Sequence, residues 1–277
     1  SMMGSAVSPS PASRSDRGWY PMPRHLLTLA LTGALAASTA ARADPRSLST
    51  NVPVQIEDAL PVRLGTLELQ GDNRFTRDTH NRRGSDLLAS SLVLKLGLLP
   101  GLQVGLSPSY RFGDQSGADG GNGTVDVLYR FTDNSAYLPA LALHGYYAQP
   151  YGAGHRSVQY TLRGIATKYL GGSERSPRLH LNISWYRLAQ PSPTQRADQL
   201  ELAVGHSRLV SDSTALVVEV VHGAKPERRA NQTFVDVGVR HEASDGWAVS
   251  LGVGAGIAQQ SPALRAFFAV QRSLRLF

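Results

Sequence analysis

Two serine–histidine pairs are the candidates for nucleophilic chemistry in this chain: His155 with Ser157, and the adjacent His206 and Ser207. An imidazole activates a hydroxyl only when the two side chains lie within hydrogen-bond reach, and adjacent residues of a strand point to opposite faces. Only His155 and Ser157 meet that condition. The next two residues are valine and glutamine, not an orienting asparagine or aspartate. A lipid hydrolase is therefore kept as an alternative function, and no catalytic residue is assigned.

Two glycine-rich stretches have the composition of ligand-binding loops but lack the neighbouring structure or residue order that such loops need. GVGAG at 252–256 is followed by more strand-like sequence, whereas a dinucleotide loop needs a helix there. GDQSGADGGNG at 113–123 lacks the ligand order of a calcium loop. Since the chain also has no cysteine, we predict no cofactor and no metal site. The first stretch is interpreted as small interior residues and the second as an outer loop.

Charged residues on one face of the predicted strands form the sharper candidate site. They are Asp126, Arg130, Arg163, Glu201, Glu219, Asp236, Arg240 and Arg265. We expect three aromatic residues to line the same path, namely Tyr147, Tyr186 and Phe234. Buried charges must pair or be solvated. Two interpretations stay open: a network of ion pairs that stiffens or plugs the interior, and a set of charges that selects a solute.

Strict alternation of apolar and polar residues identifies the elements that position these side chains. In SLVLKLGLLPGLQVGLS, residues 91–107, leucine or valine recurs at every second position on both sides of a Leu-Pro-Gly turn. Such alternation predicts strands with one apolar face. We expect the leucines to face lipid and Lys95, Gln103 and Ser107 to face a lumen.

The same alternation predicts twelve strands. Their expected bounds are 62–72, 86–98, 101–112, 123–132, 138–149, 157–169, 178–189, 198–210, 214–224, 232–242, 247–258 and 263–276. Most exceed the usual soluble strand of about 5–6 residues and match the roughly 9–11 that cross a bilayer. Compact turns alternate mostly with longer polar links. We therefore predict an all-β, transmembrane, antiparallel up-and-down barrel spanning 62–277.

The N-terminal region predicts export. Arg24 and His25 precede an apolar run at 26–37, and Ala41-Arg42-Ala43 fits a cleavage site. This is the pattern of a secretory signal peptide, cut after Ala43, and the run is too short to span a bilayer. Residues 1–23, rich in serine and proline, are expected to be a disordered, non-native or misplaced start. Residues 1–43 are thus assigned as leader, and the mature protein is assigned to a bacterial outer membrane.

Composition agrees with a barrel and argues against a nucleic-acid partner. The 277 residues are 42% hydrophobic, and the net charge is +7. Mean hydropathy is −0.19, which suits a barrel because only alternate residues touch lipid. All but three of the 28 basic residues are arginine, scattered over strands and links. They form no basic helix of the kind that binds nucleic acid.

Residues 44–61 are predicted to be a periplasmic or lumen-plugging segment. Twelve strands enclose a narrow interior, and Glu57 and Asp58 would meet lumenal arginines there. The chain ends on Phe277, and many outer-membrane barrels end on a phenylalanine that the assembly machinery recognises. The alternate positions before it are Arg275, Ser273 and Gln271 rather than apolar, which a bulge or a last residue outside the ladder would explain.

Several segments resemble the barrel family associated with the meta-pathway of phenol degradation, a set of outer-membrane transporters. They are PVQIEDALPVRLGTLELQ, GLLPGLQVGLSPSYRFGD, GGNGTVDVLYRF and LPALALHGYYAQPYG, within about residues 51–152. The resemblance implies passage of small hydrophobic or aromatic molecules. We expect a channel for passive uptake with outer-membrane lipids and a small solute as partners, and no enzymatic activity. A closed structural barrel is the other alternative.

Overall fold

The computed structural model describes residues 39–40, 44–79, 85–114, 118–153, 157–173, 175–226 and 230–277. Residues 38–277 form one compact unit. The predicted leader lies outside the described residues, apart from the two-residue strand β1 (Thr39–Ala40), which pairs with the last strand. His155 of the serine–histidine candidate also lies outside them.

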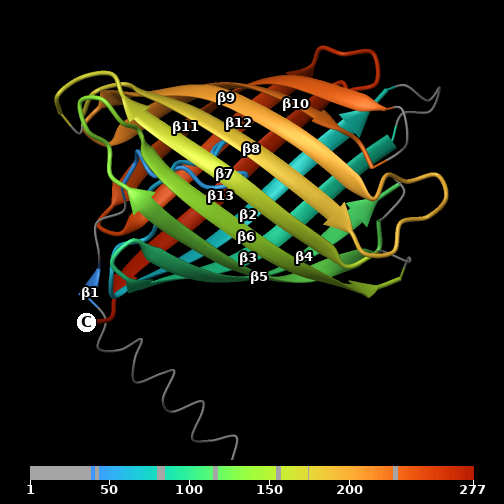
Figure 1. The fold of residues 1–277 in the computed structure, drawn as a ribbon, viewed down its shortest axis with the longest axis horizontal. Coiled ribbons are helices and arrows are strands. Elements are labelled where there is room, and N and C mark those ends of the chain that lie inside the picture. Colours follow the sequence, from blue (N-terminus) through green and yellow to red (C-terminus); the bar gives the residue numbers. More distant parts are fainter. Residues whose placement is uncertain are drawn as a thin grey trace, which may run out of the picture. The chain divides into compact units, whose positions relative to one another are not determined.

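Twelve strands of the described chain close into an antiparallel barrel, which confirms the predicted fold class (Figure 1). Each pairs with its neighbours in sequence, and the last also pairs with the first from Leu264↔Arg77 to Arg275↔Thr66. The strands are β2 (Thr66–Asp78), β3 (Ser85–Leu99), β4 (Leu102–Gly113), β5 (Gly120–Thr132), β6 (Ala140–Gly152), β7 (Gln159–Tyr169), β8 (Arg178–Leu188), β9 (Asp198–Ser211), β10 (Thr214–Ala224), β11 (Asn231–Ser244), β12 (Trp247–Gly256) and β13 (Leu264–Arg275). In the described ranges, no helix has the length and apolar character to cross a membrane.

The two faces of the wall follow the alternation in the sequence. Leu92 and Leu106 are 52% and 49% exposed on the outside, whereas Lys95 and Gln103 are 8% and 4% exposed. Side chains of a strand alternate between faces, so within residues 91–107 the leucines point outward and the polar residues point inward. The predicted orientation of residues 91–107 is confirmed.

The two ends of the barrel differ in their connections. At one end, three of the five connections are the tight turns Pro100–Gly101, Asp212–Ser213 and Asp245–Gly246, and the other two span 133–139 and 170–177. We call this the turn end, and it also holds the C-terminus (Figure 1). We call the opposite end the loop end. Outer-membrane barrels have short periplasmic turns and longer extracellular loops, so this asymmetry gives the barrel a direction.

The first strand is displaced from its predicted position. It runs from Thr66 to Asp78, not over 62–72. Gly65 adopts a left-handed φ of 71°, which breaks the extended run before Thr66. Residues 73–77, expected in a link, instead pair with both β13 and β3, and Asp78 pairs with Ser85 of β3. The connection after β2 is therefore shorter than predicted.

Candidate functional site: the barrel interior

Residues 44–63, which we call the inner segment, lie inside the barrel (Figure 1, blue trace). Val54, Ile56 and Ala59 are all 0% exposed. Asp44 and Arg63, at the two ends of the segment, both line a cavity at the turn end. The inner segment therefore enters and leaves the barrel through the same end.

Wall side chains bind the backbone of the inner segment along its return half. Glu219 accepts hydrogen bonds from the amides of Gln55 (2.8 Å) and Ile56 (2.5 Å). The other pairs, amide first, are Glu57 with Asn182 (2.8 Å), Ala59 with Thr167 (2.9 Å) and Val62 with Gln103 (3.0 Å). A buried amide without a partner is costly, so these acceptors specify where the segment lies.

Apolar packing supplies the rest of the attachment. Leu48, Val54 and Ile56 form one buried cluster with wall residues Ala203, Val217 and Val221. Ala59 forms a second with Leu128, Ala140, Ala142 and Ile165. These inward-facing apolar residues would meet water in an empty lumen, so their burial under the segment is favourable.

Glycines on the inner wall provide room for the segment. A Cβ at Gly252 would overlap the carbonyl oxygen of Pro53, and one at Gly238 would lie 2.8 Å from Cγ1 of Val54. A Cβ at Gly205 would lie 2.8 Å from Cδ1 of Ile56. Within the 252–256 stretch, the segment occupies the space at Gly252, whereas Gly254 lies against the Asp236 carboxylate and Gly256 against the Pro262 carbonyl.

Filling one of these sites should displace the segment. Overpacking typically costs ~1–3 kcal/mol, so Gly252→Leu is expected to raise the solvent access of the segment by about tenfold. The chain has no cysteine, so Val54→Cys supplies a unique thiol whose maleimide labelling rate measures that access. Gly164→Leu is the matched control, because a Cβ there meets nothing within 4 Å. Equal labelling rates in both backgrounds would contradict the assigned packing.

Glu57 joins the inner segment to a buried charged cluster on the wall. Its carboxylate lies 3.0 Å from Nη1 of Arg163 and 3.0 Å from Nδ1 of His144. Nε2 of His144 lies 2.8 Å from Asp126, and the Tyr146 hydroxyl donates to Glu57 at 3.0 Å. The predicted contact of Glu57 with a lumenal arginine is present, whereas Asp58 accepts amides of its own segment instead.

A second cluster lies at the tip of the segment. Arg265 forms a bidentate ion pair with Asp236 and lies 3.5 Å from Glu219. Its guanidinium sits 3.8 Å above the ring centre of Phe234 and donates to the Gln55 side chain at 2.7 Å. All three charged residues are at most 3% exposed, so this cluster is a tightly paired network.

The remaining predicted charges also face inward. Glu201 accepts from the Tyr186 hydroxyl at 2.8 Å and from Gln55 at 2.7 Å. Arg240 is 1% exposed and donates to Gln271 at 2.9 Å. Arg130 lies at the turn end, paired with Asp133 at 3.0 Å. Their role in a solute path stays a prediction.

The prediction that Tyr147 lines the interior is wrong. It is 38% exposed on the outer wall, where its ring centre lies 5.5 Å from that of Tyr160. Tyr147 has the parity of the outward-facing Leu143, whereas the inward position belongs to Tyr146. The adjacent tyrosines are distinguished only by counting along the strand.

Sequence reasoning missed most of the polar residues that hold the segment. Gln103 was expected to face the lumen, but Asn182 and Thr167 were not singled out as ligands of a backbone. His144 is not among the predicted site residues, although it bridges Glu57 and Asp126. The available signal was their inward parity, because each lies on the polar face of its strand.

The serine–histidine contact in the structure differs from the predicted ones. Ser157 donates to the carbonyl of Val158 and accepts from the amide of Gln190. Ser207 instead lies 2.8 Å from Nε2 of His180, whose Nδ1 lies 3.1 Å from the Thr167 hydroxyl. Ser207 and His180 are 3% and 2% exposed. This buried pair has a hydroxyl in place of the carboxylate that would orient the base.

Asp58 gives the docking of the inner segment a pH dependence. Burial raises the pKa of Asp58 to about 7, against the charge of Arg178 and the amides of Leu48 and Leu60. Its ordinary pKa is 3.8, so the docked segment holds this proton more tightly than a released one. The favourable contribution of Asp58 to the free energy of docking is largest below pH 3.8 and is lost as the pH rises to about 7.

Glu57 acts in the opposite direction. Burial favours its neutral form, but the charges of His144 and Arg163 outweigh burial and hold the pKa of Glu57 well below its usual range. Its contribution to docking is therefore present above pH 4.5 and is lost at lower pH. Docking is strongest where both contributions overlap, near pH 4–5.

Raising the pH from 5 to 8 should therefore increase the maleimide labelling rate of Val54→Cys relative to that of free cysteine at the same pH, since Asp58 then ionises and docking weakens. Asp58→Asn cannot ionise and should lose most of that increase. An unchanged pH response in Asp58→Asn would show that another group is responsible.

Comparisons with known proteins support the fold. Neither a protein-family model nor a curated protein sequence matches the chain. An outer membrane channel from Pseudomonas putida F1 has a TM-score of 0.61 at 14% identity, over 78% of this chain and 98% of that chain. The NanC porin has a TM-score of 0.51 at 7% identity, over 74% of this chain and 97% of that chain. The KdgM porin has a TM-score of 0.50 at 11% identity, over 75% of this chain and 98% of that chain. In the described residues, no group of three histidine, aspartate or glutamate side chains is placed to hold a metal ion. The chain has the fold of outer-membrane barrel channels.

Proposed function

We propose that the protein is a passive channel of a bacterial outer membrane, rather than an enzyme, and that its inner segment limits conduction. The observation that carries this proposal is the barrel itself, with an apolar outer wall and a polar, charged interior. Cavities of about 760 and 750 Å³ at the turn end supply an entrance. We assign that end to the periplasm, because outer-membrane barrels have their short turns there.

The solute class is a separate part of the proposal. The resemblance to the phenol meta-pathway barrels implies small hydrophobic or aromatic molecules. The narrow interior of twelve strands favours small solutes over large ones.

Phe277, 70% exposed just beyond the last ladder pair at Arg275, is available to the barrel-assembly machinery.

Planar bilayers test the channel directly. The full chain, reconstituted after refolding in detergent, should give discrete current steps. Benzyl alcohol should reduce these currents more than glycerol does if an aromatic solute enters the path. Equal effects of the two would reject the aromatic class while leaving the channel in place.

A closed structural barrel is the second candidate, and the burial of the middle of the inner segment, where Val54, Ile56 and Ala59 are 0% exposed, favours it. This candidate predicts no current above background from the full chain. Deletion of residues 46–61 distinguishes the two candidates further, because it should produce conduction only if the inner segment is the obstruction.

A further inference from the structure

The turn end contains two adjoining cavities that the ion-pair network does not occupy. Both are lined by Leu60, Arg130 and Tyr169, and we call their combined space the vestibule. Its outer rim includes the β5–β6 connection, where Ser135 and Ala136 accept hydrogen bonds from Lys168 at 2.6 and 2.9 Å. A space of about 760 Å³ in the first cavity alone is in the range of small-molecule sites.

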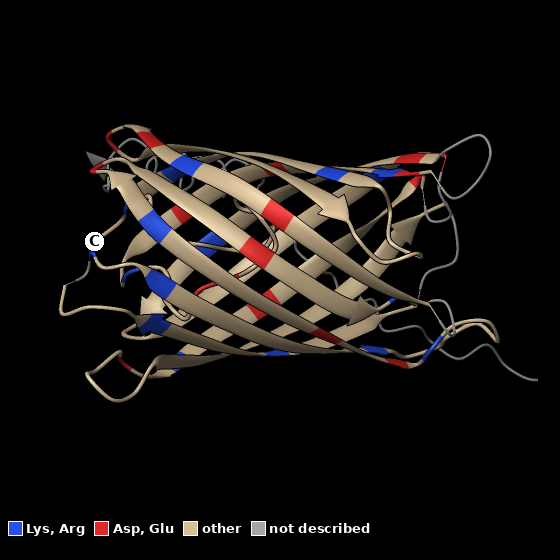
Figure 2. Cartoon of the chain, turned by 90° about the horizontal axis from the view of Figure 1, so that it is seen from above, with Lys and Arg blue, Asp and Glu red and all other residues tan. Residues whose placement is uncertain are grey.

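Positive charge predominates around the vestibule. Its basic lining residues are Arg46, Arg63, Arg130, Lys168, Arg178 and Arg275, and its acidic ones are Asp44, Glu68 and Asp133. In Figure 2 several basic bands lie on the strands at the end of the barrel that holds the C-terminus, and basic and acidic bands are also present at the opposite end. Field lines focus in such a cleft and raise the local concentration of anions.

The acidic residues leave this excess positive charge available. Asp133 pairs with Arg130 at 3.0 Å, but its side chain is 80% exposed. An exposed pair of this kind contributes about 0–1 kcal/mol, so an incoming carboxylate can replace Asp133 at little cost. Hydrogen bonds from Lys168 to backbone carbonyls orient its ammonium without neutralising it.

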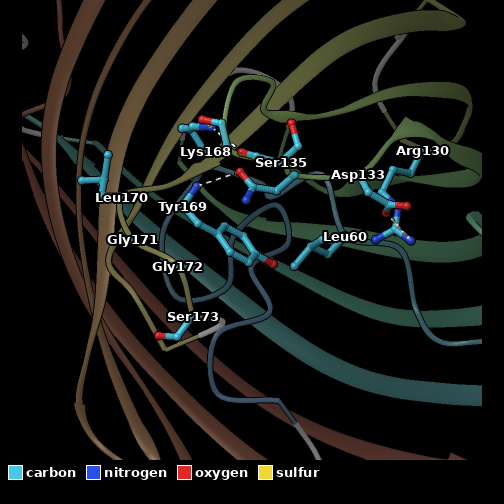
Figure 3. Close-up of a pocket in the computed structure, with 12 residues that line it drawn as sticks. Leu60, Arg130, Asp133, Ser135, Lys168, Tyr169, Leu170, Gly171, Gly172 and Ser173 are labelled. Carbon is cyan, nitrogen blue, oxygen red and sulfur yellow. Dashed lines mark hydrogen bonds and ion pairs between the residues drawn. The ribbon is translucent and has the colours of Figure 1, made fainter.

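An apolar surface lies next to these cations. The Tyr169 ring and Leu60 line the same space between Lys168 and Arg130 (Figure 3). The guanidinium of Arg178 lies 4.5 Å from the Tyr169 ring centre, a cation–π distance that fixes the ring. A flat apolar group can pack on this surface while its charged end reaches Arg130 or Lys168.

We propose that the vestibule is a binding site for small organic anions, in which a carboxylate meets Arg130 or Lys168 and an apolar or aromatic body packs on Tyr169 and Leu60. This inference rests on the proposed channel function for its purpose, which is to concentrate such solutes at the inner mouth. The binding itself is a property of the folded barrel and is testable without conduction.

Calorimetric titration of the full chain in neutral detergent provides the test, with benzoate as probe and benzyl alcohol as the uncharged control. Benzoate should bind at least about tenfold more tightly, and its affinity should fall as ionic strength rises. The double variant Arg130→Gln/Lys168→Gln should lower benzoate affinity by about tenfold. Arg187→Gln is the matched control, since Arg187 pairs with Asp198 on the exposed surface near the loop end, and it should stay within about twofold.

Two further results keep the proposal falsifiable. The variant Arg130→Lys/Lys168→Arg retains both charges and should retain benzoate binding, which separates loss of charge from loss of fold. Equal affinities for benzoate and benzyl alcohol, or an unchanged affinity in the glutamine double variant, would overturn the site. Benzoate binding by a protein that gives no bilayer current would instead reject the channel and leave the site standing.

Discussion

Deleting residues 46–61 should raise single-channel conductance by roughly a factor of three or more, because the segment fills the constriction through which ions must pass. The deletion removes Val54, Ile56 and Ala59, which are fully buried, and exposes Glu219 and Asn182 to lumenal water. The barrel should persist, since every ladder from β2 to β13 is formed by strands alone. Planar-bilayer recording measures the effect.

A full-length variant separates removal of the segment from removal of chain. Val54→Ser/Ile56→Ser keeps the length but weakens the apolar cluster with Val217 and Val221, so it should open intermittently to the conductance of the deletion. The same change at the outer-wall residues Val204 and Val237, 49% and 43% exposed, is the control. An unaltered conductance after the deletion would place the obstruction elsewhere.

Asp236→Ala should destabilise the barrel by about 3–5 kcal/mol, because it leaves the buried Arg265 guanidinium without its bidentate partner. Glu219, 3.5 Å away, remains as a partial substitute, which places the effect toward the lower end of the range. The shift in the guanidinium chloride midpoint, followed by tryptophan fluorescence in detergent, gives the magnitude.

The interpretation depends on the cost of an unpaired charge. The double variant Asp236→Ala/Arg265→Met removes both charges and should recover much of the lost stability. Asp198→Ala breaks the half-exposed pair with Arg187 and should cost less than ~1 kcal/mol. A double variant no more stable than Asp236→Ala would mean that the lost packing of the Asp236 side chain against Gly254, not the unpaired charge, sets the loss.

The barrel was predictable because its signal is local. The alternation around Leu92 and Lys95 is visible within a few residues, and parity alone gives the face of each side chain. Tyr147 was misplaced because its aromatic type was weighed above its parity. The first strand was misplaced because only the structure shows that residues 62–63 continue the inner segment and that Gly65 ends it.

The attachment of the inner segment was not predictable in detail. Gln55 and Glu219 are 164 residues apart in sequence, and five strands separate Gln103 on β4 from Glu219 on β10. Which acceptors meet which amides depends on how the closed barrel brings distant strands around one segment. The sequence indicated that Glu57 would find an arginine, but not that it would be Arg163.

Since both ends of the inner segment leave through the turn end, it forms a simple hairpin and is not threaded through the cylinder. A mechanical pull applied at Asp44 would therefore peel its contacts one after another, beginning with the hydrogen bond from Arg240 to the Asp44 carbonyl, while the wall stays intact. A tether at the turn end would extract the segment with modest force, and slack would let it return.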